Sequence, residues 1–150
     1  TTLPAPDPAA APVEPGSLQG ALVLMVEDNP VNMLIASAML EQWGVRIEQA
    51  SDGQQALQAV QRRARHGPMF DAVLMDMVLP GINGVEAIRR IRALDAPFGR
   101  VPIIGISGRS EDEAASRAVG ADVFLVKPVS PRDLATALHE ARSRAAAATS

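Results

Sequence analysis

Short apolar runs and amphipathic stretches alternate along the chain, and this alternation limits the folds that are open to it. The apolar runs are five or six residues long and are bounded by turn residues; they span residues 21–26, 45–50, 70–75, 101–106 and 122–126. Runs of this length without a polar face are typical of buried β-strands. The stretches between them place apolar residues on one face at helical spacing, as Val31, Leu34, Ile35 and Ala38 do.

Residues that favour helix N-termini stand at the start of the amphipathic stretches. They are Asn29 before Pro30, Asp52, Ser110 with Glu113 three positions later, and Ser130 before Pro131. Buried strands that alternate with helices form a parallel sheet covered on both faces. We therefore predict a three-layer α/β/α domain with a five-stranded parallel sheet and five helices.

The two ends of the chain differ in composition from this repeating region. Residues 1–19 are rich in Pro and Ala, which favours extended conformations over packing. We expect a linker over residues 1–19, the folded domain over 20–142 and a frayed tail over 143–150. A linker in front of the domain indicates that another domain precedes it in a longer protein.

Composition excludes several classes of function. The 150 residues include no Cys, which excludes disulfides, thiolate metal sites and cysteine nucleophiles. The net charge is −3, and the cations are scattered among acids, so no basic surface for nucleic acid is expected. No apolar run approaches the ~20 residues of a membrane helix. We expect this segment to contact neither nucleic acid nor membrane and to be cytoplasmic.

Polar residues follow most of the predicted strands directly. They are Glu27 and Asp28 after the first strand, Asp76 after the third, Ser107 and Gly108 after the fourth, and Lys127 after the fifth. In an open parallel sheet, ligands bind beyond the carboxyl ends of the strands. We therefore expect these side chains to converge at one edge. Asp52, which follows the second strand, is interpreted as a helix cap only.

Three carboxylates, a lysine and a hydroxyl at one edge are suited to phosphoryl transfer. Carboxylate oxygens are the ligands that Mg²⁺ prefers, and the ion offsets the repulsion among Glu27, Asp28 and Asp76. A carboxylate that attacks phosphorus needs the phosphoryl oxygens neutralised. The metal, Lys127, Ser107 and nearby backbone N–H groups can do this. We therefore predict phosphoryl transfer to a carboxylate of this site, with Mg²⁺ (or Mn²⁺ in its place) as the cofactor; the family resemblance described next implies that the acceptor is Asp76.

Taken in order, these motifs resemble the receiver (response-regulator) family of two-component signalling. The matching segments are residues 26–29, residues 74–77 with Pro80 and Gly84, residues 106–108, and residues 120–122 leading to Lys127 and Pro128. The resemblance extends from about Leu22 to Leu138, which is nearly all of the predicted domain. It implies a flavodoxin-like fold with the strand order 2-1-3-4-5.

The resemblance also implies roles for individual residues. The metal ligands would be Glu27, Asp28, Asp76 and the backbone carbonyl of Met77. Asp76 would be phosphorylated by a phosphohistidine donor, and Lys127 would pair with the acyl phosphate. The Lys127–Pro128 peptide bond would be cis.

A conformational switch is implied as well. Ser107 would move toward the phosphate and Phe124 would change rotamer with it, so that the fourth and fifth helices report the change. Phe124 is equally well interpreted as simple packing against the sheet. Val78 and Arg109 stand at positions that tune phosphoryl lifetime in the family.

The opening of the first helix, from Asn29 to Asn32, resembles receivers of hybrid sensor histidine kinases, as does the Pro-rich linker. Our hypothesis is a C-terminal receiver of such a kinase, whose parent protein can be anchored in the inner membrane. It would take the phosphoryl group from a histidine kinase domain and pass it to a histidine phosphotransfer domain through the surface around Asn32 and Met33. The domain would catalyse its own phosphorylation and dephosphorylation, while histidine kinase activity would lie outside this segment.

Three alternatives remain open. One is a single-domain response regulator, and another is a docking module that works without phosphorylation, although the complete acidic site argues against it. The third is a phosphatase of the haloacid-dehalogenase type. That family needs a second Asp two residues after the nucleophile, and Val78 stands there in this chain.

Overall fold

A parallel five-stranded sheet forms the centre of the protein. The computed structural model describes residues 18–79, 81, 83–94 and 98–149, and of Phe98 and residues 142–149 it describes only the backbone. The strands are β1 (Leu22–Val26), β2 (Arg46–Ala50), β3 (Ala72–Asp76), β4 (Ile103–Ser107) and β5 (Val123–Val126). Their order is β2-β1-β3-β4-β5, and every pairing is parallel. The predicted fold and strand order are confirmed.

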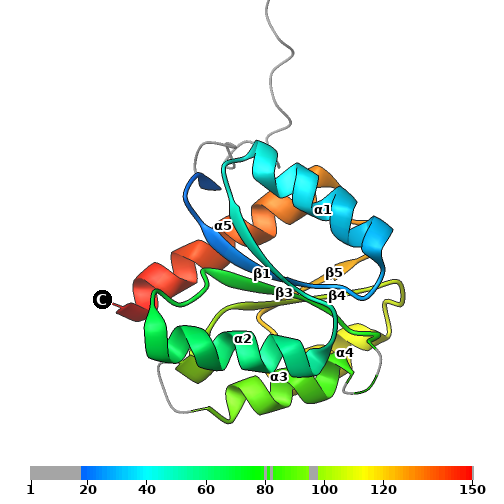
Figure 1. The fold of residues 1–150 in the computed structure, drawn as a ribbon. Coiled ribbons are helices and arrows are strands. Elements are labelled where there is room, and N and C mark those ends of the chain that lie inside the picture. Colours follow the sequence, from blue (N-terminus) through cyan, green and yellow to red (C-terminus); the bar gives the residue numbers. More distant parts are fainter. Residues whose placement is uncertain (1–17, 80, 82, 95–97, 150) are drawn as a thin grey trace, which may run out of the picture.

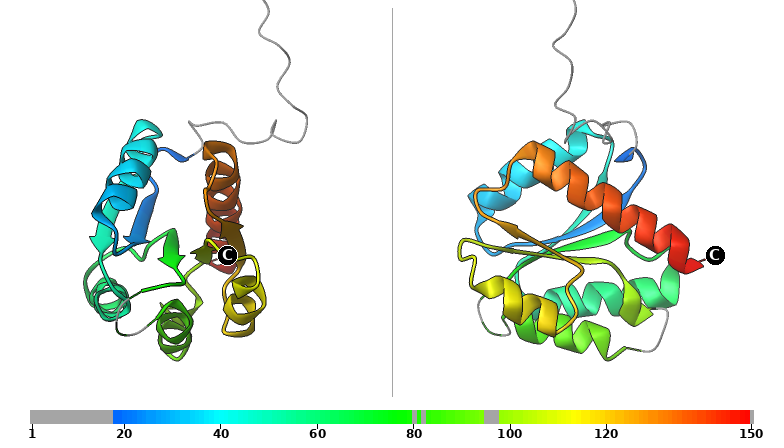
Figure 2. Two further views of the ribbon diagram at one scale, coloured as in Figure 1. Left: turned by 90° about the vertical axis from the view of Figure 1, so that its right-hand side faces the viewer. Right: turned by 180° about the vertical axis from the view of Figure 1, so that it is seen from behind.

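Helices cover both faces of this sheet. They are α1 (Pro30–Gln42), α2 (Gly53–His66), α3 (Gly84–Arg92), α4 (Asp112–Ala118) and α5 (Pro131–Thr149), with a short 3₁₀ turn, η2 (Phe98–Arg100). Helices α1 and α5 lie on one face, and α2, α3 and α4 lie on the other (Figure 1). Figure 2 shows the same three layers from the side and from behind.

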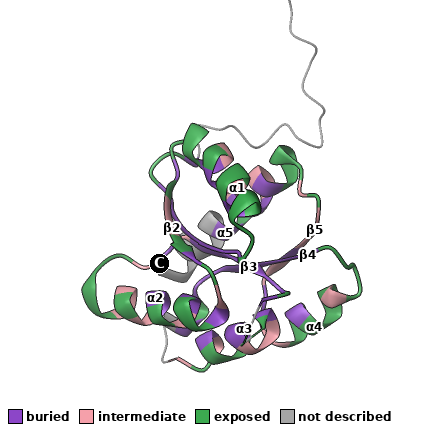
Figure 3. Ribbon diagram, turned by 45° about the vertical axis from the view of Figure 1, so that its right-hand side comes forward, coloured by how far each residue is buried: buried purple, intermediate pink, exposed green. Residues whose placement is uncertain are grey.

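Alternate residues of the central strands supply the two apolar cores. In β1, Leu24 and Val26 belong to the cluster under α2 and α3, whereas Val23 and Met25 belong to the cluster under α1 and α5. Successive strand residues point to opposite faces, so a strand covered on both sides must be apolar throughout. The central strands β1, β3 and β4 are accordingly buried throughout, whereas the edge strands β2 and β5 include exposed and half-buried residues. Exposed residues also lie on the outer faces of the helices (Figure 3).

Most of the predicted helix caps are present. The Asn29 side chain accepts hydrogen bonds from the N–H groups of Val31 and Asn32, and the side chains of Asp52 and Ser130 cap α2 and α5 in the same way. Ser110 does not cap α4, so that prediction was wrong. In a capped helix, the Glu113 N–H would donate to the side-chain oxygen of Ser110. Here it donates instead to the backbone carbonyl of Ser110. The chain therefore makes one extra turn before α4.

The predicted domain boundaries stay predictions. Most of the expected linker, residues 1–17, lies outside the described residues. Leu18 is fully buried and its carbonyl accepts from the Ala21 N–H at 3.0 Å, so the packed region already includes this residue of the predicted linker. At the other end, α5 continues past residue 142 to Thr149. Within the described part of the chain, no helix is long and apolar enough to cross a membrane.

Arg92, the last residue of α3, joins several segments near the amino ends of the strands. Its guanidinium donates to Gly99 O at 2.7 Å, Val101 O at 2.6 Å, Gly120 O at 2.8 and 3.0 Å, and Asp122 Oδ2 at 3.0 Å. Asp122 also accepts from Ile103 N–H. The Arg92 side chain is 21% exposed, so most of this network is shielded from water. It ties α3 to the starts of β4 and β5.

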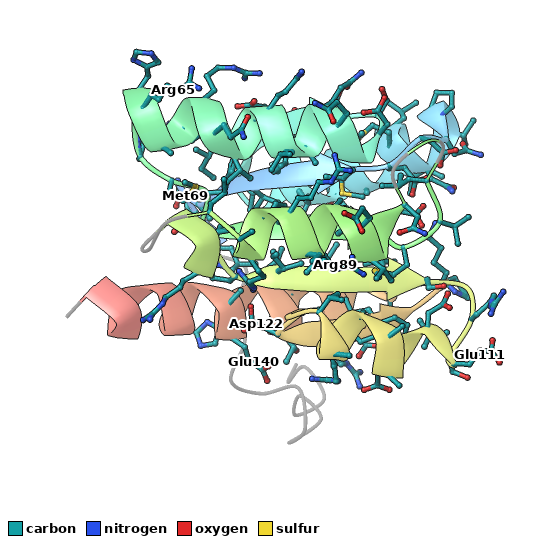
Figure 4. All side chains as sticks on the ribbon, turned by 90° about the horizontal axis from the view of Figure 1, so that it is seen from below. Arg65, Met69, Arg89, Glu111, Asp122 and Glu140 are labelled. Atoms are coloured by element: carbon teal, nitrogen blue, oxygen red, sulfur yellow. The ribbon has the colours of Figure 1, made fainter. Side chains whose placement is uncertain are left out.

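We predict that Arg92→Met lowers the free energy of unfolding by about 2–3 kcal/mol, because it leaves a partly buried carboxylate and several carbonyl groups without their donor. Arg89→Met is the matched control on the same helix. Arg89 belongs to α3 (Figure 4), its side chain is 65% exposed, and it pairs with Glu86 at the surface, so its loss should cost less than about 0.5 kcal/mol. Urea unfolding of both variants measures the difference, and equal losses would contradict the assigned role.

Candidate functional site

The strand register brings the predicted site residues to one edge of the sheet. Asp76 is the last residue of β3 and pairs with Ile106, while Ser107 is the last residue of β4 and pairs with Val126. Glu27 and Lys127 come one residue after β1 and β5. Because β1, β3, β4 and β5 are neighbours in the sheet, their carboxyl ends lie side by side.

Three carboxylates converge at this edge. One oxygen from each of Glu27, Asp28 and Asp76 lies within 4.8 Å of the others, a spacing at which the three can share a metal ion. Glu27 and Asp76 are 4% and 5% exposed, whereas Asp28 faces solvent. Asn29, and not Asp28, caps α1. The Asp28 carboxylate therefore belongs with those of Glu27 and Asp76, which together form the acidic cluster, and does not cap the helix.

Lys127 provides the positive charge beside this cluster. Its Nζ donates to Asp76 Oδ2 at 2.9 Å and to Glu27 Oε1 at 3.3 Å. Burial alone would lower the pKa of Lys127, but the hydrogen bond and charge of Asp76, together with Glu27, outweigh it and raise the pKa. The ammonium group is thus held in its charged form. The peptide bond that joins Lys127 to Pro128 is cis, as expected.

The environment of Glu27 disfavours its negative charge. Burial is the largest cause and raises the pKa of Glu27 above its ordinary value of 4.5, and the charge of Asp76 raises it further. The Asn29 N–H, which donates to Glu27 Oε2 at 3.2 Å, and Lys127 lower it only in part. A cation bound between the carboxylates would relieve this unfavourable charge.

Both oxygens of the Asp76 carboxylate are held by donors. Oδ2 accepts from Lys127, and Oδ1 accepts from the Val78 N–H at 2.9 Å. The Met77 carbonyl accepts from Gly84 N–H at 3.2 Å and keeps a second lone pair for another partner. A Cβ at position 84 would lie 2.5 Å from the Met77 Cα and 2.7 Å from the Asp76 carbonyl. Glycine at this position therefore lets α3 begin against the loop that follows Asp76.

The Ser107 hydroxyl lies at the same edge but bonds elsewhere. It donates to Asp112 Oδ2 at 2.5 Å and accepts from the Arg109 N–H at 3.1 Å. Asp112 was missed by the sequence analysis. The available signal was a carboxylate five positions after the hydroxyl, in the first turn of a helix. Its spacing matches no common motif, so only the folded loop reveals the contact.

The remaining predicted residues differ in exposure. Phe124 is 9% exposed and belongs to the core under α2 and α3, which fits the packing interpretation and leaves the switch role a prediction. Val78 is exposed, and Arg109 is exposed and paired with Glu111 at 3.3 Å. Their proposed effect on phosphoryl lifetime also stays a prediction. Pro80 lies outside the described residues.

A largely apolar cavity of about 420 Å³ opens beside the acidic cluster. It lies between α1 and the segment that follows β5. Ile35 and Met39 of α1 line one side, Val129 lines the other, and Asp76 and Lys127 are among the lining residues. The phosphoryl acceptor predicted from the sequence is thus accessible from the α1 side of the domain.

A family model described as "Response regulator receiver domain" matches residues 23–139. This span covers all of the sheet except Leu22, the first residue of β1, and it includes every residue of the site described above. The chain therefore belongs to the response regulator receiver family of two-component signalling. The prediction made from the ordered motifs is confirmed.

The relatives of this chain include sensor proteins that are much longer than it is. Sensor protein GacS of Pseudomonas syringae pv. syringae is 35% identical over 125 residues, which cover 81% of this chain and 13% of that protein. Virulence sensor protein BvgS of Bordetella bronchiseptica is 36% identical over 151 residues, covering 96% of this chain and 12% of that protein. The chain thus corresponds to about an eighth of each of these relatives.

Two similar crystal structures are receiver domains of histidine kinases. The receiver domain of sensor histidine kinase PA1611 from Pseudomonas aeruginosa, with a magnesium ion coordinated in its active-site cleft, has a TM-score of 0.73 at 35% identity, covering 83% of this chain and 98% of that one. The receiver domain of histidine kinase CKI1 from Arabidopsis thaliana, complexed with Mg²⁺ and BeF₃⁻, has a TM-score of 0.73 at 32% identity, covering 86% and 94%.

We predict that Glu27→Gln stabilises the metal-free protein at pH 7. Folding raises the pKa of Glu27, so its contribution to stability is full below about 4.5 and is lost as the pH rises through the higher folded value. Above that value the ionised side chain opposes folding, and glutamine removes this cost. We expect the midpoint of thermal unfolding in EDTA to rise by a few degrees.

Glu41→Gln, which removes an exposed carboxylate from α1, is the control and should leave the midpoint unchanged. A lower midpoint for Glu27→Gln than for the wild type would show that the attraction to Lys127 outweighs the cost of burial.

Proposed function

We propose that this receiver domain accepts a phosphoryl group on Asp76 as a signalling step. The observation that carries the proposal is the environment of the Asp76 carboxylate. It is buried at the sheet edge, lies within 4.8 Å of two further carboxylates, and is bonded to Lys127 and the Val78 N–H. Fixed orientation together with nearby positive charge is what a carboxylate nucleophile needs for attack on phosphorus.

The residues fit a divalent metal. The ligands would be Glu27, Asp28, Asp76 and the backbone carbonyl of Met77, all oxygen donors of the kind that Mg²⁺ binds. The raised pKa of Glu27 supports the assignment, because a cation offsets the unfavourable charge. When bound, the metal supplies neutralisation of charge on the phosphoryl oxygens.

The transfer itself needs few groups. One carboxylate oxygen of Asp76 forms a bond to phosphorus while the bond from phosphorus to the donor nitrogen breaks, and the bonding electrons leave with the donor imidazole. Lys127 neutralises negative charge on the acyl phosphate, and the Val78 N–H donates to it. The Ser107 hydroxyl can donate to a phosphoryl oxygen once it leaves Asp112.

We propose a hybrid sensor histidine kinase as the parent protein. The sensor relatives, of which this chain spans only about an eighth, support this assignment. A histidine kinase domain would then be the phosphoryl donor and a histidine phosphotransfer domain the next acceptor. The cytoplasmic location expected from the sequence belongs to the same proposal.

The surface of α1 beside the cavity suits such a partner. Val31, Leu34 and Ile35 are 62%, 69% and 57% exposed, which is unusual for apolar side chains that cluster on one helix. Asn32 is exposed and lines the cavity, whereas Met33 is buried. The proposed docking surface around Asn32 therefore includes Leu34 as its exposed apolar residue in place of Met33. An apolar helix that carries the donor histidine could lie against this patch and reach Asp76.

Intact-protein mass after incubation with acetyl phosphate or phosphoramidate tests the acceptor. We expect one phosphoryl adduct on the wild type with Mg²⁺ and little adduct in EDTA. We expect none on Asp76→Asn, because the neutral amide of asparagine cannot replace the carboxylate as the nucleophile. Asp52→Asn, which changes a half-buried capping carboxylate outside the cluster, should be labelled like the wild type. An adduct on Asp76→Asn equal to that on the wild type would exclude Asp76 as the acceptor.

Leu34→Asp tests the donor surface. With the kinase core encoded in the parent reading frame as donor, we expect transfer to slow by about tenfold, since burial of one leucine contributes roughly 1.5–3 kcal/mol to an interface. Labelling by acetyl phosphate, which needs no protein docking, should be unchanged. Equal transfer to Leu34→Asp and to the wild type would place the docking surface elsewhere.

A further inference from the structure

The hydroxyl of Ser107 has its single proton engaged by a residue outside the acidic cluster. The Arg109 backbone N–H is itself a donor, so the hydroxyl can only accept from it. The Asp112 carboxylate, 2.5 Å away, is an acceptor when ionised. The proton of Ser107 is therefore donated to Asp112. The side chain of Ser107 is 1% exposed, so water does not offer a competing partner.

Asp112 is held in place from the other side of the loop. It is the first residue of α4, and its N–H donates to the Arg109 carbonyl at 3.1 Å. The Arg109 guanidinium lies 3.7 Å from Asp112 Oδ1. The bond between Ser107 and Asp112 thus connects the end of β4 with the start of α4. The Asp112 side chain is 22% exposed, so solvent can satisfy its carboxylate if the serine leaves.

A phosphoryl group on Asp76 would bring new acceptor oxygens to the same edge. One hydroxyl proton cannot be donated to Asp112 and to a phosphoryl oxygen at once. We propose that Asp112 is a positioning residue that holds the Ser107 hydroxyl before phosphorylation and competes with the phosphoryl group for its proton. This inference rests on the proposed role of Asp76 as the acceptor. The bond between Ser107 and Asp112 spans the β4–α4 loop, residues 108–111. Breaking this bond would then be part of the free energy needed to accept the phosphoryl group.

The competition has a measurable size. A hydrogen bond to an ionised group contributes about 1.5 kcal/mol or more, which corresponds to about a tenfold change in an equilibrium constant. Removing the Asp112 acceptor should therefore favour the state in which Ser107 serves the phosphoryl group. Asp112→Asn keeps a neutral acceptor of the same shape and should have a smaller effect in the same direction.

Binding of beryllium fluoride in the presence of Mg²⁺, followed by NMR of the backbone amides, gives this equilibrium without a covalent step. The probe occupies a similar receiver domain in the CKI1 structure. We expect Asp112→Ala to bind BeF₃⁻ about tenfold more tightly than the wild type, and Asp112→Asn to lie between them. The matched control is Glu111→Ala, which removes the neighbouring exposed carboxylate that also pairs with Arg109, and it should bind like the wild type.

A double-mutant cycle separates positioning from a purely structural role. In the Ser107→Ala background there is no proton to compete for, so Asp112→Ala should no longer change the affinity. Equal effects of Asp112→Ala with and without Ser107, or an effect no larger than that of Glu111→Ala, would overturn the inference. If the alanine variant does not fold, the same cycle with Asp112→Asn decides, because asparagine preserves the side-chain shape.

The wild type distinguishes this inference from the proposed function. If it binds BeF₃⁻ with Mg²⁺ and the Asp112 variants match it, only the role of Asp112 fails. If it neither binds BeF₃⁻ nor becomes phosphorylated with Mg²⁺, the proposed function of Asp76 fails and the inference fails with it.

Discussion

Like charges gathered at the carboxyl ends of the strands are the constraint on which the rest of the structure depends. Glu27 and Asp76 are both almost fully buried, and burial of two carboxylates side by side opposes folding unless positive charge is near. Lys127 meets this requirement, and it reaches both carboxylates from a strand two places away from β3. The raised pKa of Glu27 shows that one lysine does not fully compensate. An arrangement of this kind favours binding of a further cation.

The two ends of the sheet differ in how their charges are balanced. At the amino ends, the Arg92 guanidinium donates to backbone carbonyl groups and to Asp122, so each of its N–H groups has an acceptor inside the fold. At the carboxyl ends, the acidic cluster has more negative than positive charge and opens into a cavity beside α1. The candidate site therefore lies at the end of the sheet where negative charge exceeds positive charge.

Much of this could be predicted from the sequence because the signals are local or follow from topology. The apolar runs identified the strands to within two residues at each end, and the carboxyl-end rule for parallel sheets brought Glu27, Asp76 and Lys127 together. The failures concern the β4–α4 loop. Ser110 was taken as a helix cap and Asp112 was overlooked, because the path of a loop depends on tertiary contacts that propensity does not encode. Exposure of Leu34 next to buried Met33 also required the folded helix.

We propose that the phosphoryl group resides on Asp76, and chemical reduction of the acyl phosphate tests this directly. Reduction of the phosphorylated protein with borohydride converts an aspartyl phosphate to homoserine, and peptide sequencing by mass spectrometry then locates the converted residue. We expect conversion at position 76 and at no other acidic position, and only in protein that was phosphorylated with Mg²⁺. Conversion at Asp28 or Glu27, or phosphorylation that survives without any converted carboxylate, would contradict it.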